Sequence, residues 1–266
     1  MNFEFIDLSL DDRQFKGETH NKNLEDAMKQ AIVNFCKSMD TGLFLLDMPT
    51  GFGKTYSVLD FMVDNYDAPE FKDKKIFFVT TLKKNLPDKE LREHFARRGK
   101  ADDYDKYCLR IEANADMVVQ KLDELYRARK IPPTITMKQE FKDLHGSVKL
   151  LNEYRDKKRE LKGNSKDIIN VLCKSAEDAI RKQQEGAFRK VIESELKQFR
   201  TPKEKLKNIA NNPDYHWIGE LYPAVYTREK RIFFMSMDKF FLGNTTIIEL
   251  HTAFTIMILQ KMQLFL

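Results

Sequence analysis

Residues 43–55 read LFLLDMPTGFGKT, and this stretch decides the fold. An apolar run over 43–46 ends abruptly in a glycine-punctuated loop that closes on Lys-Thr, and an apolar helical pattern begins at residue 56. A buried strand, a glycine-rich loop and a helix, in this order, are the context that a phosphate-binding loop requires. We therefore predict a P-loop between a parallel strand and a helix.

The residue types in this loop suit a polyphosphate. Gly51 and Gly53 lack a Cβ, so the backbone can take positive φ and turn its N–H groups toward phosphate oxygens. The N-terminus of the following helix also favours negative charge. Lys54 and Thr55 are the expected catalytic residues, because the amine reaches the β and γ phosphates and the hydroxyl ligates Mg²⁺. ATP and Mg²⁺ are the expected ligands, and the expected nucleotide-binding residues are Pro49, Thr50, Gly51, Phe52, Gly53, Lys54, Thr55 and Tyr56.

Met48 stands where the general pattern GxxxxGK[ST] has its first glycine. With that departure, MPTGFGKT resembles motif I of superfamily 2 (DEAD/DEAH-like) helicases and related DNA translocases. The resemblance covers roughly residues 20–90 and 225–249, and only motif I is highly specific. It implies the amino-terminal RecA-like domain of an ATP-dependent helicase-type hydrolase: an α/β fold with a parallel sheet and flanking helices. The alternative is a chance glycine-rich turn.

A helix is expected upstream of the loop, over residues 23–37. One face of it carries Leu24, Ala27, Met28, Ala31, Ile32 and Phe35. Members of the helicase family commonly carry a glutamine upstream of motif I that reads the adenine edge. The resemblance therefore makes Gln30 a candidate for adenine recognition, with an exposed helix glutamine as the alternative.

Two further apolar runs, 76–79 and 231–235, predict buried strands followed by polar and basic residues. They resemble motif Ia and the motif Ib or Ic region, where the family contacts the nucleic-acid backbone. Hydroxyls, lysines and free amides at a strand end suit phosphates; the alternative is an ordinary strand before a solvated helix. The expected nucleic-acid contacts are Thr80, Thr81, Lys83, Lys84, Ser236 and Lys239. We expect the nearby aromatic residues to be core rather than base-stacking, namely Phe233, Phe234, Phe240 and Phe241.

Between these strands we predict a large, charged, all-helical insertion over 100–212. It divides the chain into three parts. Residues 1–99 are the first part of the ATP-binding domain, residues 100–212 are the insertion, and over residues 213–266 the chain returns to the ATP-binding domain. Residues 100–210 hold 26 Lys and Arg against 19 Asp and Glu, so the whole-chain net charge of +5 originates there. Basic clusters can neutralise phosphates, although such a run is more often a solvated helix face. The clusters are Arg155, Lys157, Lys158 and Arg159, and Arg181, Lys182, Arg189 and Lys190.

An acid pair at the end of a strand is missing from the sequence. Hydrolysis in this class needs a carboxylate for Mg²⁺ and a glutamate to orient water. The one Asp-Glu pair, Asp123-Glu124, lies in a helical pattern and is expected on a helix surface. The resemblance also implies a second RecA-like domain with an arginine finger, which we do not expect within these residues. Residues 250–266 differ in composition from the rest of the chain. We therefore expect the chain to be a truncated, frameshifted copy of a longer protein, with authentic sequence ending near Glu249. The alternative is a genuine apolar helix or strand at the C-terminus.

Composition and residue spacing limit the other kinds of site and cellular location that the chain can have. The three cysteines and five histidines have no metal-ligand or disulfide spacing, so we expect metal only with the nucleotide. The start of the chain is acidic where a signal peptide is basic, and no apolar run reaches the ~20 residues of a membrane span. We expect a cytoplasmic protein without membrane contact.

The sequence predicts an ATP-binding helicase or translocase domain acting on nucleic acid, DNA in preference to RNA. Without the acid pair it should be an incomplete ATPase. One alternative is a non-catalytic module that binds nucleotide, nucleic acid or a protein partner through the helical insertion. A weaker alternative is a P-loop kinase.

Overall fold

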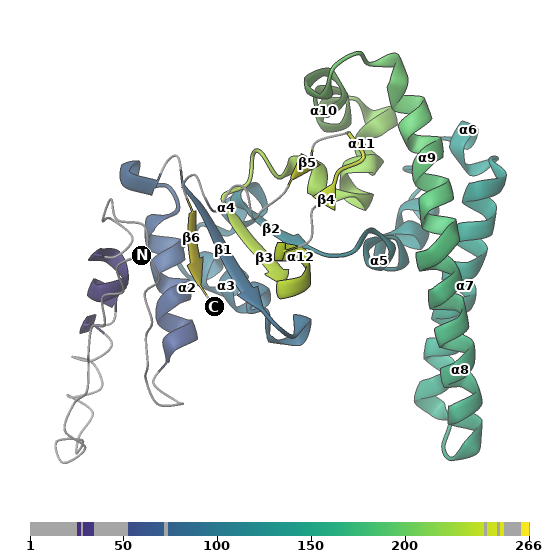
Figure 1. Cartoon of the computed structure of the whole chain (residues 1–266), viewed down its shortest axis with the longest axis horizontal. Coiled ribbons are helices and arrows are strands. Elements are labelled where there is room, and N and C mark those ends of the chain that lie inside the picture. The colour runs from purple at the N-terminus through teal and green to yellow at the C-terminus, as the bar shows by residue number, and fades with distance from the viewer. Residues whose placement is uncertain are drawn as a thin grey trace. The chain divides into compact units, whose positions relative to one another are not determined.

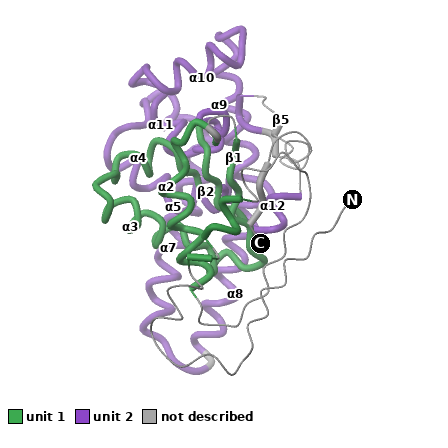
Figure 2. The backbone as a smooth tube through the Cα atoms, turned by 90° about the vertical axis from the view of Figure 1, so that its left-hand side faces the viewer, with its two compact units in different colours: residues 1–110, 230–235, 257–266 green, residues 111–229, 236–256 purple. Residues whose placement is uncertain are grey.

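The computed structural model describes residues 26–27, 29–34, 53–71, 74–241, 244–248, 251–252 and 262–265 (Figure 1). The chain forms two compact units, which are distinguished by colour in Figure 2. Unit 1 comprises residues 1–110, 230–235 and 257–266, and unit 2 comprises residues 111–229 and 236–256. Each unit has its own hydrophobic core, so each is described by itself.

Unit 1 is built on a small sheet with strand order β2-β3-β1-β6. Its strands are β1 (Lys75–Thr80), β2 (Cys108–Ile111), β3 (Ile232–Ser236) and β6 (Met262–Phe265). β1 pairs with β6 in parallel. The starts of β1, β3 and β2 lie side by side, because the N–H of Ile76 donates to the carbonyl of Arg231 and the N–H of Arg231 donates to the carbonyl of Tyr107, each at 2.8 Å. All four described strands of this sheet therefore run in the same direction.

The central strands are buried on both faces, as is usual for a parallel sheet. All four residues over 76–79 and all five of β3 are buried. The Phe77 and Phe233 rings stack with centroids 4.8 Å apart across the two strands. These uninterrupted apolar runs are why the two segments form strands, and they confirm the strands predicted at 76–79 and 231–235.

Residues 29–34 of unit 1 are helical. Unit 1 also contains helices α2 (Lys54–Asn65), α3 (Asp88–Arg97) and α4 (Ala101–Tyr107), with 3₁₀ turns at Pro69–Phe71 and Lys83–Asn85. Their apolar residues share one core with the sheet. That core comprises Leu59, Met62, Val63, Tyr66, Ile76, Phe78, Leu86, Leu91, Phe95, Tyr104, Cys108, Ile232 and Phe234. Helix α2 is thereby packed against the sheet through its middle and its C-terminal end.

Unit 2 is almost entirely helical. Its helices are α5 (Asn114–Arg127), α6 (Pro133–Thr136), α7 (Gln139–Glu160), α8 (Asn164–Ala179), α9 (Glu185–Glu195), α10 (Pro202–Asn211), α11 (Pro213–Leu221) and α12 (Met237–Phe241). A π-helical turn, Ile180–Gln184, joins α8 to α9, 3₁₀ turns cover Leu196–Gln198 and Pro223–Tyr226, and β4 (Asn244–Thr245) pairs antiparallel with β5 (His251–Thr252). Thr201 and Glu204 form a capping box at the start of α10, which explains why that helix begins there.

The observed fold confirms the α/β class and corrects two details. The insertion over 100–212 is not all helical, because β2 lies within it and joins the sheet of unit 1. Only four residues long, β2 is too short to leave a periodic pattern in the sequence. Phe233, Phe234 and Phe240 are buried as predicted, whereas Phe241 is 61% exposed and the prediction for it is wrong. The strand predicted at 43–46 lies outside the described residues, and β6 falls within the segment expected to be out of frame.

Gly219 in α11 provides a test of packing in unit 2. A Cβ at this position would lie 2.2 Å from Oη and 2.7 Å from Cζ of Tyr226. We expect Gly219→Ala to lower the free energy of unfolding by about 1–3 kcal/mol, because overpacking outweighs the helix preference of alanine. Urea unfolding followed by the fluorescence of Trp217, the one tryptophan of the chain, measures this.

Gly186 in α9 is the matched control, since a Cβ at this position would meet no atom within 4 Å outside its own helix backbone. Gly186→Ala should stabilise the unit by about 0.5–1 kcal/mol. Equal effects of the two substitutions would contradict the packing described for Tyr226.

Candidate nucleotide site at the start of α2

Helix α2 begins immediately after a glycine in the left-handed region. Gly53, with φ 68° and ψ 21°, is the N-cap residue, and its carbonyl accepts the first helical hydrogen bond from the N–H of Ser57 at 2.9 Å. A side chain at this φ would be strained, which explains the glycine. Lys54 and Thr55 are the first two residues of the helix. The other predicted loop residues, Pro49, Thr50, Gly51 and Phe52, lie outside the described residues.

The electrostatics of this helix end suit an anion. The first turn of α2 contains no acidic residue, so the partial positive charge of its N-terminus is not offset by its own side chains. Thr55 is exposed, Lys54 is half-buried and Tyr56 is 46% exposed. Backbone amides, an ammonium group and a hydroxyl thus occur in consecutive residues, a donor set that fits a polyphosphate with its Mg²⁺.

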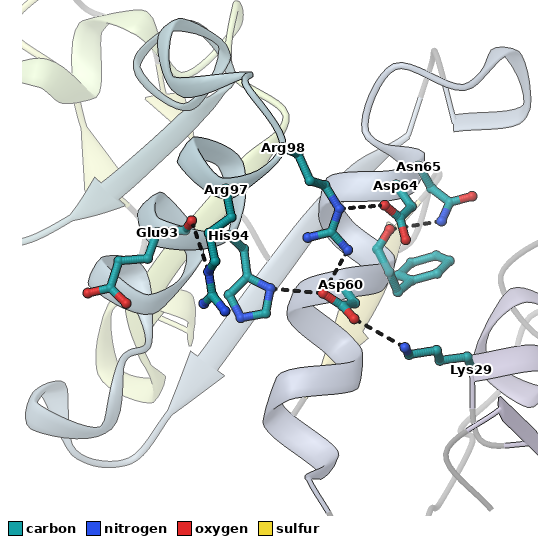
Figure 3. A network of polar contacts seen from close by, with 9 residues as sticks. Lys29, Asp60, Asp64, Asn65, Glu93, His94, Arg97 and Arg98 are labelled. Carbon is teal, nitrogen blue, oxygen red and sulfur yellow. Dashed lines mark hydrogen bonds and ion pairs between the residues drawn. The ribbon is translucent and has the colours of Figure 1, made fainter. Parts of the chain in front are cut away.

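A polar network fixes α2 two turns further along (Figure 3). Asp60 is 6% exposed, and its Oδ1 accepts hydrogen bonds from His94 Nδ1 at 2.9 Å and from Arg98 Nη2 at 2.8 Å. Its Oδ2 accepts a bond from Lys29 Nζ at 3.1 Å. Arg98 Nε also pairs with Asp64 at 3.0 Å. One carboxylate therefore connects α2 to the helix around Lys29 and to the end of α3.

The ionisation of Asp60 reflects these contacts. Burial by itself would raise the pKa of this carboxyl, but the hydrogen bonds from Arg98, Lys29 and His94 outweigh burial, so its pKa is lowered from the ordinary value. His94 also contacts the Tyr56 ring edge-on, with centroids 4.6 Å apart. The same histidine thus links the network to the first turn of α2.

Gln30, the candidate adenine-reading residue, is exposed on the helical segment 29–34. Its Nε2 donates to Oδ1 of Asn34 at 2.8 Å, one turn along the same helix. Ile32 is 2% exposed, as the predicted apolar face requires, whereas Ala27 is exposed.

The predicted nucleic-acid contacts fall into two groups. Thr80 ends β1 and donates through Oγ1 to the carbonyl of Leu82 at 2.8 Å, and Thr81, Lys83 and Lys84 are exposed beyond it. Ser236 is 5% exposed at the end of β3, which leaves Lys239, partly exposed in α12, as the more accessible residue of that pair. Thr80 is the last residue of β1 and Ser236 the last residue of β3, which is the strand next to β1 in the sheet.

Asp123 and Glu124 lie in α5, which confirms the helical interpretation of this acid pair. Asp123 pairs with His145 at 3.1 Å and with Arg127 at 2.6 Å, and Glu124 is exposed. Among the described residues, no group of three or more His, Cys, Asp or Glu is placed to hold a metal ion. Glu112, which follows β2 and accepts from Gln120 at 2.7 Å, is a strand-end acid that sequence patterns did not reveal, because β2 is so short.

The basic clusters of unit 2 are largely paired with acids. Arg155 bonds Glu177 at 2.7 Å, and Arg181 bonds Asp116 at 2.5 Å. Further pairs are Arg159–Asp156, Lys182–Asp178 and Arg189–Glu185. The excess charge of this unit is therefore less available to phosphates than the sequence indicated, in line with a solvated helix surface.

No protein-family model matches the chain, and no curated protein matches it. In the part of the chain that the structure describes, no helix combines the length and the apolar character needed to cross a membrane.

Proposed function

We propose that this chain is an ATP-binding domain of the superfamily 2 helicase or translocase type, with a RecA-like arrangement of its sheet. The observation that carries the proposal is the left-handed Gly53 directly before Lys54 and Thr55 at the start of α2. This backbone turn and these side chains are what a P-loop requires, and the buried parallel sheet of unit 1 supports the same fold.

In the proposed site, the amides at the start of α2 and the Lys54 ammonium would bind the phosphates, and the Thr55 hydroxyl would be a ligand of Mg²⁺. When bound, the metal would supply positive charge against the charge that develops on the phosphates. Thr80, Thr81, Lys83 and Lys84 follow β1 and would contact the backbone of a nucleic acid, DNA in preference to RNA. Because the sequence has no Asp-Glu pair after an apolar strand, we expect nucleotide binding with slow hydrolysis.

The test is ATP turnover by the wild-type chain and by Lys54→Ala, each with and without single-stranded DNA. We expect a low rate that DNA stimulates and that Lys54→Ala abolishes. Phosphoryl transfer to an added acceptor would instead indicate a kinase, and a rate unaffected by Lys54→Ala would refute the proposal.

A non-catalytic binding module is the second candidate. It is favoured by the location of Asp123 and Glu124 within helix α5 rather than at the end of a strand. Salt-sensitive DNA binding without any ATP turnover would identify this class, because phosphate contacts weaken as salt rises.

A further inference from the structure

Helix α8 carries apolar residues on two of its faces. It forms a helical hairpin with α7 (Figure 1), and on the inner face Cys173 is buried in the core of unit 2. A second face bears Ile168, Val171 and Leu172, whose exposed fractions are 64%, 68% and 37%. Residues three and four apart are neighbours on a helix surface, so these three side chains form one continuous patch. We call this patch the α8 stripe.

The α8 stripe has the character of a packing face. A surface helix normally has one apolar face and one polar face, and a contiguous exposed apolar patch marks an interaction site more often than scattered single residues do. Ser175 and Ala179 continue the stripe toward the end of the helix, at successive spacings of four residues. Such small side chains let a second helix approach closely. The geometry therefore suits a helix as the occupant.

Two charges of opposite sign lie along one edge of the α8 stripe. Asp167 and Lys174 are both exposed, and neither forms an ion pair with another residue that the structure describes. They are about two helical turns apart, so they lie on the same side of the helix. Asp178, further along this edge, is already paired with Lys182 at 3.0 Å. The midpoint between Asp167 and Lys174 falls beside Val171, at the centre of the stripe.

This placement makes α8 complementary to a second copy of itself. If two α8 helices lie antiparallel across a two-fold axis beside Val171, Asp167 of one copy is level with Lys174 of the other. Symmetry then forms the ion pair twice. The antiparallel direction also brings opposite ends of the two helix dipoles together. A parallel pair would instead set this edge against the other edge, where Ile169 and Ala176 offer no charge.

We propose that α8 is a self-association surface, through which two copies of this chain pair antiparallel with an Asp167–Lys174 ion pair on each side of Val171. The inference goes beyond the proposed function and is independent of it, since no residue of unit 1 takes part. One helix face buries less than the ~800 Å² per partner of a standard interface. The dimer should therefore be weak, with a dissociation constant of roughly 1–100 μM.

The experiment measures the dimer dissociation constant of the full chain by sedimentation equilibrium, over protein concentrations of about 1–200 μM. We expect Val171→Glu to weaken the dimer at least about 100-fold, because two carboxylates would meet beside the two-fold axis. Met137→Glu is the matched control: Met137 is 65% exposed, close to the value for Val171, and lies outside α8. It should keep the wild-type constant. Circular dichroism verifies that both variants are folded.

Charge reversal tests the direction of the pairing. Asp167→Lys and Lys174→Glu, made singly, should each weaken the dimer about tenfold, because each sets like charges opposite one another at two symmetric sites. The double variant restores opposite charges and should dimerise within about threefold of the wild type. Association through apolar contact alone would show no such recovery.

Four results would overturn the inference. The chain could be monomeric over the whole concentration range, or the dimer could survive Val171→Glu. A double charge variant as weak as the single ones would exclude the antiparallel register. A monomeric chain that binds vesicles of anionic lipid, and loses this binding in Val171→Glu, would assign the α8 stripe to a membrane surface instead.

Discussion

Asp60→Asn is expected to lower the free energy of unfolding by about 2–4 kcal/mol, the largest loss we predict for a single substitution. The amide removes the negative charge that three cationic or polar donors share: Lys29, His94 and Arg98. Lys29 and Arg98 are each about one-third exposed and can regain water, which moderates the cost. His94 is buried, and the amide leaves it only a weaker, uncharged acceptor.

Urea unfolding followed by circular dichroism measures this change, and hydrogen exchange in α2 and α3 locates it. Asp64→Asn is the control: Asp64 lies one turn further along α2 and binds Arg98, but its side chain is 56% exposed. We expect it to cost less than about 1 kcal/mol, as for other exposed ion pairs. Equal losses for the two variants would show that the buried network contributes nothing beyond a surface pair.

The stability difference between wild type and Asp60→Asn should also depend on pH. The folded pKa of Asp60 is below its ordinary value of 3.8. A carboxyl with a depressed folded pKa contributes stability that is fully present above the unfolded pKa and is lost as the pH falls through the folded pKa. The difference should therefore be constant near neutral pH and shrink below about pH 4. A difference that grows on acidification would contradict the assigned ionisation.

Lys54→Ala is expected to weaken binding of MgATP about 100-fold, because it removes a charge-assisted contact to the phosphates. Titration with a fluorescent ATP analogue measures the affinity. Lys89→Ala is the matched control, since Lys89 is an exposed lysine in the first turn of α3, another helix of unit 1. The first turn of α3 contains Asp88 and Glu90, so no anion site is expected there and the control should bind as the wild type does.

Thr55→Val tests whether Thr55 contributes to nucleotide affinity through the metal or through the phosphates. Valine keeps the shape of threonine but removes the hydroxyl, so we expect about a tenfold loss of nucleotide affinity in the presence of Mg²⁺. Without Mg²⁺ the variant and the wild type should bind alike. A loss of the same size in both conditions would mean that Thr55 does not contact the metal.

The sequence by itself predicted the features that depend on neighbouring residues. The runs at 76–79 and 231–235 are uniformly apolar, and they form the buried strands β1 and β3. Gly53 followed by Lys54 predicted the start of a helix, and α2 begins there with Gly53 at positive φ. These features are local. A buried strand depends on a run of adjacent apolar side chains, and this helix start depends on a glycine that can take positive φ.

Only the tertiary structure decided which distant side chains meet. Lys29, Asp60, His94 and Arg98 belong to three separate helical segments, and no spacing in the sequence relates them. The pairing of Arg181 with Asp116, 65 residues away, was equally hidden, and it changes how a basic cluster is interpreted. Periodicity records which face of an element is buried, whereas the partner of a charged group depends on how packed elements bring residues together. For this chain, the local pattern therefore determined the proposed phosphate site, and packing determined the network that holds it in place.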